Sequence, residues 1–310
     1  MKDLRIFCRD CFCCLLVVSL SLGVVFFPAQ VSAKSKGKFI VGSKEFTEQL
    51  ILGHMVSAIM ADAGYDVDSR VPLGGTNIVR QALLSKQIDG YVEYTGTATM
   101  VFFKEKQVMS AERTYEMARE RDAKVGLVWL PPIRFNSTYC LMMRREMAKR
   151  LGIKSMSDLG AYLDANPGKL KIVVNNEFFA RPDGLPTMLK TYGYKLDITT
   201  LTQMDSGLIY LALKDGRADV GLGFATDGRI KAYDFVALED DRRMFPVYNP
   251  CLVVRKPFLD KDPSIALYFA KLAKALDNEA IVTLNYRVAE KKEDPKAVAT
   301  EFLKARRIIK

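Results

Sequence analysis

Aromatic and hydroxyl side chains stand where an expected strand ends, and their chemistry suits binding rather than catalysis. In the stretch "DGYVEYTG", residues 89–96, a buried strand runs into a glycine turn at Tyr94 and Thr95, and Thr97 follows. The face of a tyrosine ring attracts a cation, and a well-placed ring contributes about 0.5–2 kcal/mol. The chain has one histidine, His54, inside an apolar helical pattern, so histidine-based catalysis is nearly excluded.

Residues of the same kinds recur at other expected strand ends and strand-to-helix turns. Lysine and arginine bind carboxylates, and arginine can do so through two parallel hydrogen bonds. Aromatic rings with no carboxylate facing them suit a quaternary ammonium. Together these residues predict a site for a ligand that carries a quaternary ammonium at one end and a carboxylate at the other. The candidate ligand-binding residues are Lys44, Thr76, Tyr94, Thr97, Tyr139, Glu177, Arg181, Phe224 and Tyr248.

The elements that must position these residues alternate between strands and helices. Short apolar runs such as 38–42, 88–92 and 170–174 predict strands, and longer stretches such as 46–64, which ends at a glycine, predict helices. This alternation indicates an α/β protein with largely parallel sheets. In open α/β sheets ligands bind outside the carboxyl ends of the strands, where the candidate residues lie.

Two similar segments predict how the chain is divided. "TYCLMMRRE" (138–146) and "NPCLVVRKP" (249–257) each place Cys-Leu before two apolar residues and a basic pair. We interpret them as two strands that cross between lobes. Residues 34–139 would form the first part of lobe 1, residues 140–249 lobe 2, and residues 250–310 the return to lobe 1. The crossing strands would bring Cys140 and Cys251 near each other, and whether they form a disulfide stays open.

The N-terminus predicts export. Three basic residues in the first nine precede an uncharged apolar run at 11–27, and "VSA" at 31–33 provides the small residues of a cleavage site. This pattern is typical of a secretory signal peptide, residues 1–33, and predicts a periplasmic protein. A membrane anchor is the alternative, but the run is just under the ~18 residues of a spanning helix.

Composition and missing motifs exclude several function classes. The chain has 310 residues and a net charge of +10, with its charges scattered, so the basic surface indicates tolerance of anions rather than a nucleic-acid partner. The sequence holds no Cys/His cluster for a metal, no phosphate loop and no nucleophile elbow. We therefore expect no metal, no cofactor and no enzymatic activity.

The chain resembles the substrate-binding proteins of osmoprotectant ABC importers, the glycine betaine/carnitine/choline group, over nearly all of its length after residue 38. The motifs that carry the resemblance are "VGSKEFTEQLILG", "LGGTNIVRQAL", "IDGYVEYTGTA", "FNSTYCL", "EFFARPDGLP" and "LEDDRRMFPVYN". The resemblance implies a two-lobed type II periplasmic binding protein, each lobe a mixed sheet flanked by helices. Such a protein closes on its ligand and docks on a membrane permease driven by an ATPase.

The resemblance also implies a role for each candidate residue. Four aromatic side chains would box the trimethylammonium group of glycine betaine, proline betaine, carnitine or choline, and a second set would hold a carboxylate. Phe224 stands where the family is expected to have tyrosine, which keeps the ring face and loses the hydroxyl. Lys44, which choline-preferring relatives tend to lack, favours a carboxylate-bearing betaine. The implied aromatic set is Tyr94, Tyr139, Phe224 and Tyr248, and the implied carboxylate set is Lys44, Thr97 and Arg181, with Thr76 and Glu177 nearby.

Two alternatives stay open on the residues alone. An amino-acid or small-anion binder would use Lys44 and Arg181, with the aromatic residues in the core. An enzyme on the same fold would need Glu93 or Glu177 as a general base with a raised pKa facing the cleft. Glu93 neighbours Tyr94 in an extended stretch, so its side chain should point to the opposite face.

Overall fold

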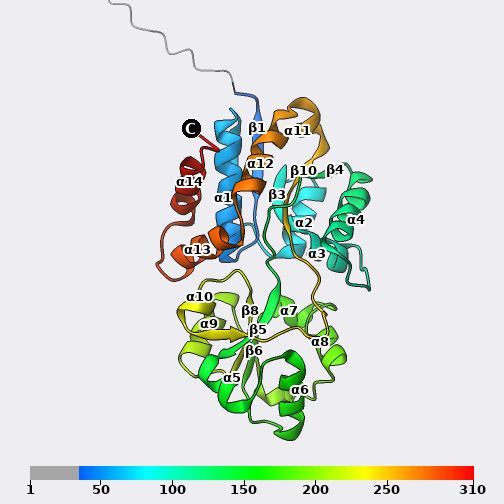
Figure 1. The fold of residues 1–310 in the computed structure, drawn as a ribbon. Coiled ribbons are helices and arrows are strands. Elements are labelled where there is room, and N and C mark those ends of the chain that lie inside the picture. The colour runs from blue at the N-terminus through cyan, green and yellow to red at the C-terminus, as the bar shows by residue number, and fades with distance from the viewer. Residues whose placement is uncertain (1–34) are drawn as a thin grey trace, which may run out of the picture. The chain divides into compact units, whose positions relative to one another are not determined.

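The computed structural model describes residues 35–310 (Figure 1). The predicted signal peptide, residues 1–33, lies outside the described residues. Within the described part, no helix is both long enough and apolar enough to cross a membrane.

The first sheet is built from both ends of the described chain. Its strand order is β2-β1-β3-β10-β4, with β1 at Lys38–Gly42, β2 at Asp66–Arg70, β3 at Gly90–Tyr94, β4 at Leu127–Trp129 and β10 at Pro250–Arg255. Strand β1 pairs in parallel with β2 and β3, whereas β10 runs antiparallel to β3 and β4. The sheet is therefore mixed, with one late strand inserted among early ones.

The second sheet repeats this plan with the middle of the chain. Its order is β7-β6-β8-β5-β9, with β5 at Tyr139–Arg144, β6 at Ile172–Val174, β7 at Leu201–Gln203, β8 at Val220–Phe224 and β9 at Phe235–Ala237. Strand β6 pairs in parallel with β7 and β8, and β5 runs antiparallel to β8 and β9. Two mixed sheets of the same plan confirm the predicted fold class. We call each sheet with its helices a lobe, lobe 1 for the first sheet and lobe 2 for the second.

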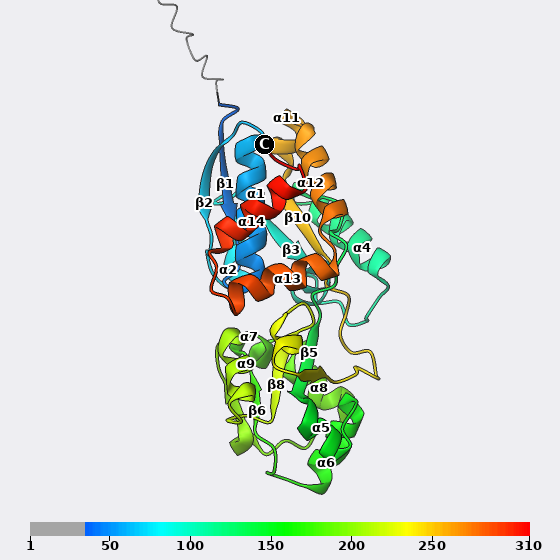
Figure 2. The same ribbon diagram turned by 60° about the vertical axis from the view of Figure 1, so that its left-hand side comes forward.

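Helices cover both faces of the first sheet, which explains why β10 is apolar from Cys251 to Val254. Along β10, Leu252 and Val254 pack on one face, and Cys251 and Val253 pack on the other. A strand buried on both faces loses the alternation of apolar and polar residues. One face is covered by α1 (Thr47–Asp62), α12 (Ser264–Ala275), α13 (Asn278–Ala289) and α14 (Pro295–Ala305), and the other by α2 (Thr76–Leu84) and α4 (Ala111–Ala123) (Figure 2).

The helices of lobe 2 are shorter and enclose a single core around the second sheet. They are α5 (Arg145–Leu151), α6 (Met156–Ala165), α7 (Asn176–Ala180), α8 (Leu185–Tyr192), α9 (Ser206–Lys214) and α10 (Arg229–Ala232). The remaining elements are the short helices α3 (Thr95–Thr97), η1 (Ala98–Phe102), η2 (Ile198–Thr200) and α11 (Lys256–Lys261).

The two Cys-Leu strands do not cross between the lobes, and this part of the sequence interpretation is wrong. Strand β5 pairs only within the second sheet and β10 only within the first. The chain passes between the sheets just before each strand, through residues 130–138 and 238–249. Because both hydrogen-bonding edges of each strand are occupied within its own sheet, the strands cannot lie side by side. Cys140 and Cys251 are accordingly buried free thiols in different sheets.

Candidate ligand-binding site

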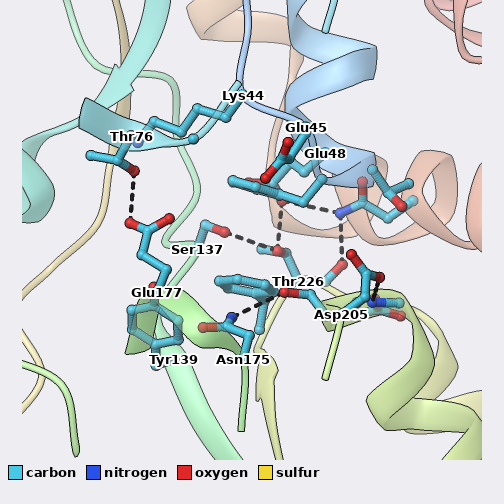
Figure 3. A pocket seen from close by; sticks show the side chains of 18 of the residues that line it. Lys44, Glu45, Glu48, Thr76, Ser137, Tyr139, Asn175, Glu177, Asp205 and Thr226 are labelled. Carbon is cyan, nitrogen blue, oxygen red and sulfur yellow. Dashed lines mark hydrogen bonds between the residues drawn. The ribbon is translucent and has the colours of Figure 1, made fainter. Parts of the chain in front are cut away.

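A cavity of about 240 Å³ lies between the two lobes, within the single unit formed by residues Ser35–Lys310 (Figure 3). All nine candidate residues line it. Lobe 1 contributes Lys44, Thr76, Tyr94 and Thr97, and lobe 2 contributes Tyr139, Glu177, Arg181 and Phe224, while Tyr248 comes from the segment that returns to lobe 1.

Strand direction explains why the aromatic residues meet. Tyr94 is the last residue of β3 and Phe224 the last residue of β8. Since β5 runs antiparallel to β8, its first residue, Tyr139, is paired directly with Phe224. In the same way the start of β10 lies beside Tyr94, which brings Tyr248, two residues before that strand, to the cavity. Both sheets thus present their aromatic residues at the carboxyl ends of parallel strands.

The aromatic side chains form a connected group that includes one residue the sequence interpretation missed. The ring centroids of Tyr139 and Phe224 are 5.1 Å apart, and those of Tyr139 and Tyr248 are 5.7 Å apart at an interplanar angle of 84°. Phe46, just before α1, stacks on Phe224 at 5.2 Å and on Tyr94 at 6.2 Å, with angles of 12° and 23°. Phe46 therefore links the tyrosine of lobe 1 to the aromatic residues of lobe 2.

Lys44 is already paired with a carboxylate of the protein. Its Nζ lies 2.6 Å from Oε1 of Glu93, and both side chains are almost fully buried. Glu93 also accepts hydrogen bonds from the hydroxyl of Tyr91 and the backbone N–H of Tyr94. The Lys44 ammonium lies 5.2 Å from the centroid of the Tyr94 ring. Lys44 thus adds less free positive charge to the cavity than the sequence suggested, although its ammonium has further N–H donors.

Arg181 is held in the same manner. Its Nε and Nη2 donate to the two carboxylate oxygens of Asp183 at 2.9 and 2.5 Å, and its Nη1 donates to Glu177 at 3.0 Å. Its guanidinium carbon lies 5.8 Å from the centroid of the Tyr139 ring. The guanidinium is therefore oriented toward the aromatic group by a two-pronged pair with a nearly buried aspartate.

Glu177 reaches across the cavity to the opposite lobe. Its Oε1 accepts a hydrogen bond from the hydroxyl of Thr76 at 2.7 Å, as well as the bond from Arg181 (Figure 3). Burial raises the pKa of this carboxyl, but the nearby charges of Lys44 and Arg181 and the hydrogen bonds outweigh burial and bring the pKa below its usual value. Glu177 is therefore an ionised carboxylate at the cavity.

Glu48 is a second carboxyl that faces the cavity and that the sequence interpretation missed. Its Oε1 accepts from the hydroxyl of Tyr94 at 2.7 Å, and its Oε2 accepts from Thr226 at 2.6 Å and Asn285 at 3.0 Å. Burial raises the pKa of Glu48 despite these hydrogen bonds. The expectation that no carboxylate faces the aromatic rings is therefore wrong, because Glu48 and Glu177 both line the cavity.

The sequence held only a weak signal for the missed residues. Phe46 and Glu48 both lie in "GSKEFTEQ", next to Lys44 and at the start of α1. An acidic residue in the first turn of a helix is ordinarily explained by the helix dipole, so Glu48 gave no sign of a binding role. Among residues 35–310, no group of three or more histidine, cysteine, aspartate or glutamate side chains could hold a metal ion.

Two mixed sheets of equal plan, with a polar and aromatic cavity between them, define the class of two-lobed solute-binding proteins. The chain belongs to the family described as the substrate binding domain of the ABC-type glycine betaine transport system, whose model matches residues 37–305. The resemblance drawn from the sequence motifs is thereby confirmed, as is the function of a substrate-binding component of an ABC-type transport system.

Individual relatives agree with this assignment. The chain is 38% identical over 274 residues to a glycine-betaine-binding protein of Pseudomonas aeruginosa, covering 87% of this chain and 88% of that protein. It is 31% identical over 291 residues to the glycine betaine-binding protein YehZ of Escherichia coli, covering 91% and 94%. Among solved structures it is similar to apo YehZ from Escherichia coli, with a TM-score of 0.65, 30% identity and coverage of 87% and 99%. A glycine betaine/carnitine/choline ABC transporter structure gives a TM-score of 0.71 at 27% identity, with coverage of 87% and 99%.

Proposed function

We propose that the cavity binds a zwitterionic quaternary-ammonium osmolyte of the glycine betaine type. The ammonium would lie among Tyr94, Tyr139, Phe224 and Tyr248, and the carboxylate on the side of Lys44, Thr97 and Arg181. The single observation that carries the proposal is that the aromatic group and both cations line one cavity, with contributions from both lobes. The names of the relatives from Pseudomonas aeruginosa and Escherichia coli support this ligand class.

The size and burial of the cavity fit a small ligand. Drug-sized ligands occupy pockets of roughly 300–1,000 Å³, and this cavity measures about 240 Å³. Tyr94, Tyr139 and Tyr248 are each less than one-tenth exposed. A cation that enters among such rings is desolvated, and each contact is then worth about 2 kcal/mol, the upper part of the range for this interaction. Carnitine remains a second candidate of the same class, since a carnitine transport binding protein of Listeria monocytogenes is 29% identical.

We infer that the chain divides at about residues 139 and 250, with the segment between them in lobe 2 and the two flanking segments in lobe 1. This division is supported by the strands, because those from β5 to β9 belong to the second sheet and the others to the first. The protein would act in the periplasm after loss of the signal peptide at 1–33, and it would close on its ligand and deliver it to a membrane permease. It would do no chemistry of its own.

The rival interpretations find less support. A small-anion binder would use the two cations alone and keep the aromatic residues in the core, whereas four aromatic candidate residues line the cavity beside these cations. An enzyme would need a general base with a raised pKa, whereas Glu93 is held in an ion pair and the pKa of Glu177 is lowered. Burial raises the pKa of Glu48, but both of its oxygens already accept hydrogen bonds from neighbouring side chains.

Isothermal titration calorimetry on residues 34–310 tests the proposed ligand. Glycine betaine should bind, whereas proline and ordinary amino acids should not. Tyr94→Ala should weaken binding by about 1–2 kcal/mol or more, because it removes a ring face and admits water. Tyr162→Ala is the matched control, since Tyr162 is a partly exposed tyrosine of lobe 2 that does not line the cavity. Equal betaine binding by the parent and Tyr94→Ala would refute the aromatic cage.

A further inference from the structure

One carboxylate occupies the place that a ligand's carboxylate would need. Glu177 lies on α7 of lobe 2, and a single oxygen, Oε1, accepts from both Thr76 of lobe 1 and Arg181 of lobe 2. Figure 3 shows its side chain extending up to Thr76, with its carboxylate at the hydroxyl of Thr76. Lys44 is close enough to favour the ionised form of Glu177. Two of the groups that we assign to the anionic end of the ligand, Lys44 and Arg181, thus lie beside a protein carboxylate.

The other two carboxylates beside Lys44 and Arg181 are held by burial and by several hydrogen bonds, whereas Glu177 is held less firmly. Glu93 is fully buried and receives three donors. Asp183 binds Arg181 through two parallel hydrogen bonds, and its side chain is 7% exposed. Glu177 uses one oxygen, and its side chain is 36% exposed. Of the three carboxylates, Glu177 is therefore the one that can leave at the least cost in burial and hydrogen bonds.

We propose that Glu177 is a specificity-determining residue whose carboxylate binds Thr76 and Arg181 in place of a ligand's carboxylate and is displaced when a zwitterion binds. This inference rests on the proposed function. Lys44 and Arg181 carry two positive charges and already face the negative charges of Glu93, Asp183 and Glu177. A ligand carboxylate added to this group meets like charge unless Glu177 moves away. A quaternary-ammonium alcohol has no carboxylate, so it can bind with Glu177 in place.

Displacement also changes the contact between the lobes. The Thr76–Glu177 hydrogen bond joins α2 of lobe 1 to α7 of lobe 2. A zwitterion that displaces Glu177 offers its own carboxylate to Thr76 and Arg181, so the link across the cavity is restored through the ligand. A choline-like cation leaves the protein's own link intact. Glu177 therefore sets the preference between zwitterion and cation without contacting the quaternary ammonium.

The test is a calorimetric comparison of glycine betaine and choline on the parent, Glu177→Gln and Glu45→Gln. Glutamine keeps the size and an acceptor oxygen for Thr76 but removes the charge. Glu177→Gln should tighten glycine betaine binding on the order of tenfold, the scale of one like-charge contact relieved at short range, and leave choline binding unchanged or weaker. Glu45→Gln is the matched control, because Glu45 also lines the cavity and is an exposed carboxylate.

The outcomes separate this inference from the proposed function. If the parent binds glycine betaine but Glu177→Gln weakens that binding, Glu177 holds the ligand directly and the stand-in role is wrong. If Glu177→Gln and Glu45→Gln shift both ligands by the same factor, only general charge is at work and the inference also fails. If the parent binds neither ligand, the proposed function fails, and this inference fails with it.

Discussion

Replacement of Lys44 by methionine should destabilise the protein even when no ligand is present. The sequence suggested that Lys44 serves the ligand, whereas its ammonium pairs at 2.6 Å with a carboxylate that is fully buried. Removal of one partner from a buried ion pair costs about 3–5 kcal/mol, because the other charge stays buried without compensation. Glu93 would keep two donors, the Tyr91 hydroxyl and the Tyr94 N–H, so we expect the lower end, about 3 kcal/mol.

The assay is urea unfolding of ligand-free protein followed by tryptophan fluorescence. The single tryptophan, Trp129, is 2% exposed on β4, so its emission reports the unfolding of lobe 1, where the ion pair lies. A loss of about 3 kcal/mol should also lower the melting temperature by roughly 6–12 °C. Lys38→Met is the matched control, because Lys38 pairs with Asp68 at 3.1 Å on the surface, with its side chain 58% exposed. Surface pairs of this kind contribute about 0–1 kcal/mol.

A double variant separates the ion pair from the lysine stem. Lys44→Met combined with Glu93→Gln removes both charges, so it should recover most of the loss seen in Lys44→Met alone. The coupling energy of the cycle should exceed about 2 kcal/mol, within the range for residues in contact. The reasoning is refuted if Lys44→Met lies within about 1 kcal/mol of Lys38→Met, or if the two substitutions at the ion pair are additive.

Three further predictions concern the cavity. Tyr94→Phe keeps the ring face, so calorimetry should show little change in betaine affinity. The variant removes a hydrogen-bond donor to Glu48 and should lower the free energy of unfolding by about 1–3 kcal/mol. Unchanged stability would contradict a structural role for this hydrogen bond. Burial raises the pKa of Glu48, so its contribution to stability is present below the ordinary value of 4.5 and is lost as pH rises through the folded pKa. The glutamine in Glu48→Gln cannot titrate. The free energy of unfolding in urea, relative to that of the parent, should therefore be higher for this variant at about pH 7 than at about pH 4. The opposite trend would contradict the raised pKa. Phe224→Tyr keeps a ring on which Tyr139 packs, so betaine binding measured by calorimetry should be unchanged or tighter. A loss of affinity of more than about tenfold would show that Phe224 is not part of the cage.

The family, the fold class and nine residues of the cavity could be predicted from the sequence, whereas Phe46 and Glu48 could not. The motifs alone identified the family that the comparison confirms over residues 37–305. The order of strands and helices indicated an α/β chain of two similar halves, and the strand-end rule placed nine residues at one cavity. These inferences succeeded because they depend on local periodicity, on short motifs and on the common edge at which parallel strands end.

The pairing of those residues and the assignment of strands to sheets could not be predicted from the sequence, because both depend on contacts between distant parts of the chain. The partners of Lys44 and Thr76 are Glu93 and Glu177, which lie 49 and 101 positions away in the chain. No local sequence pattern predicts such a contact, because the residues around a glutamate in a strand or short helix can be the same whether its side chain faces solvent, a lysine or a cavity. The two Cys-Leu strands are alike in sequence, yet they belong to different sheets. Strand β5 pairs with β8 and β9, and β10 pairs with β3 and β4, and these partners lie far away in the sequence. The charge balance of the cavity follows from these long-range contacts.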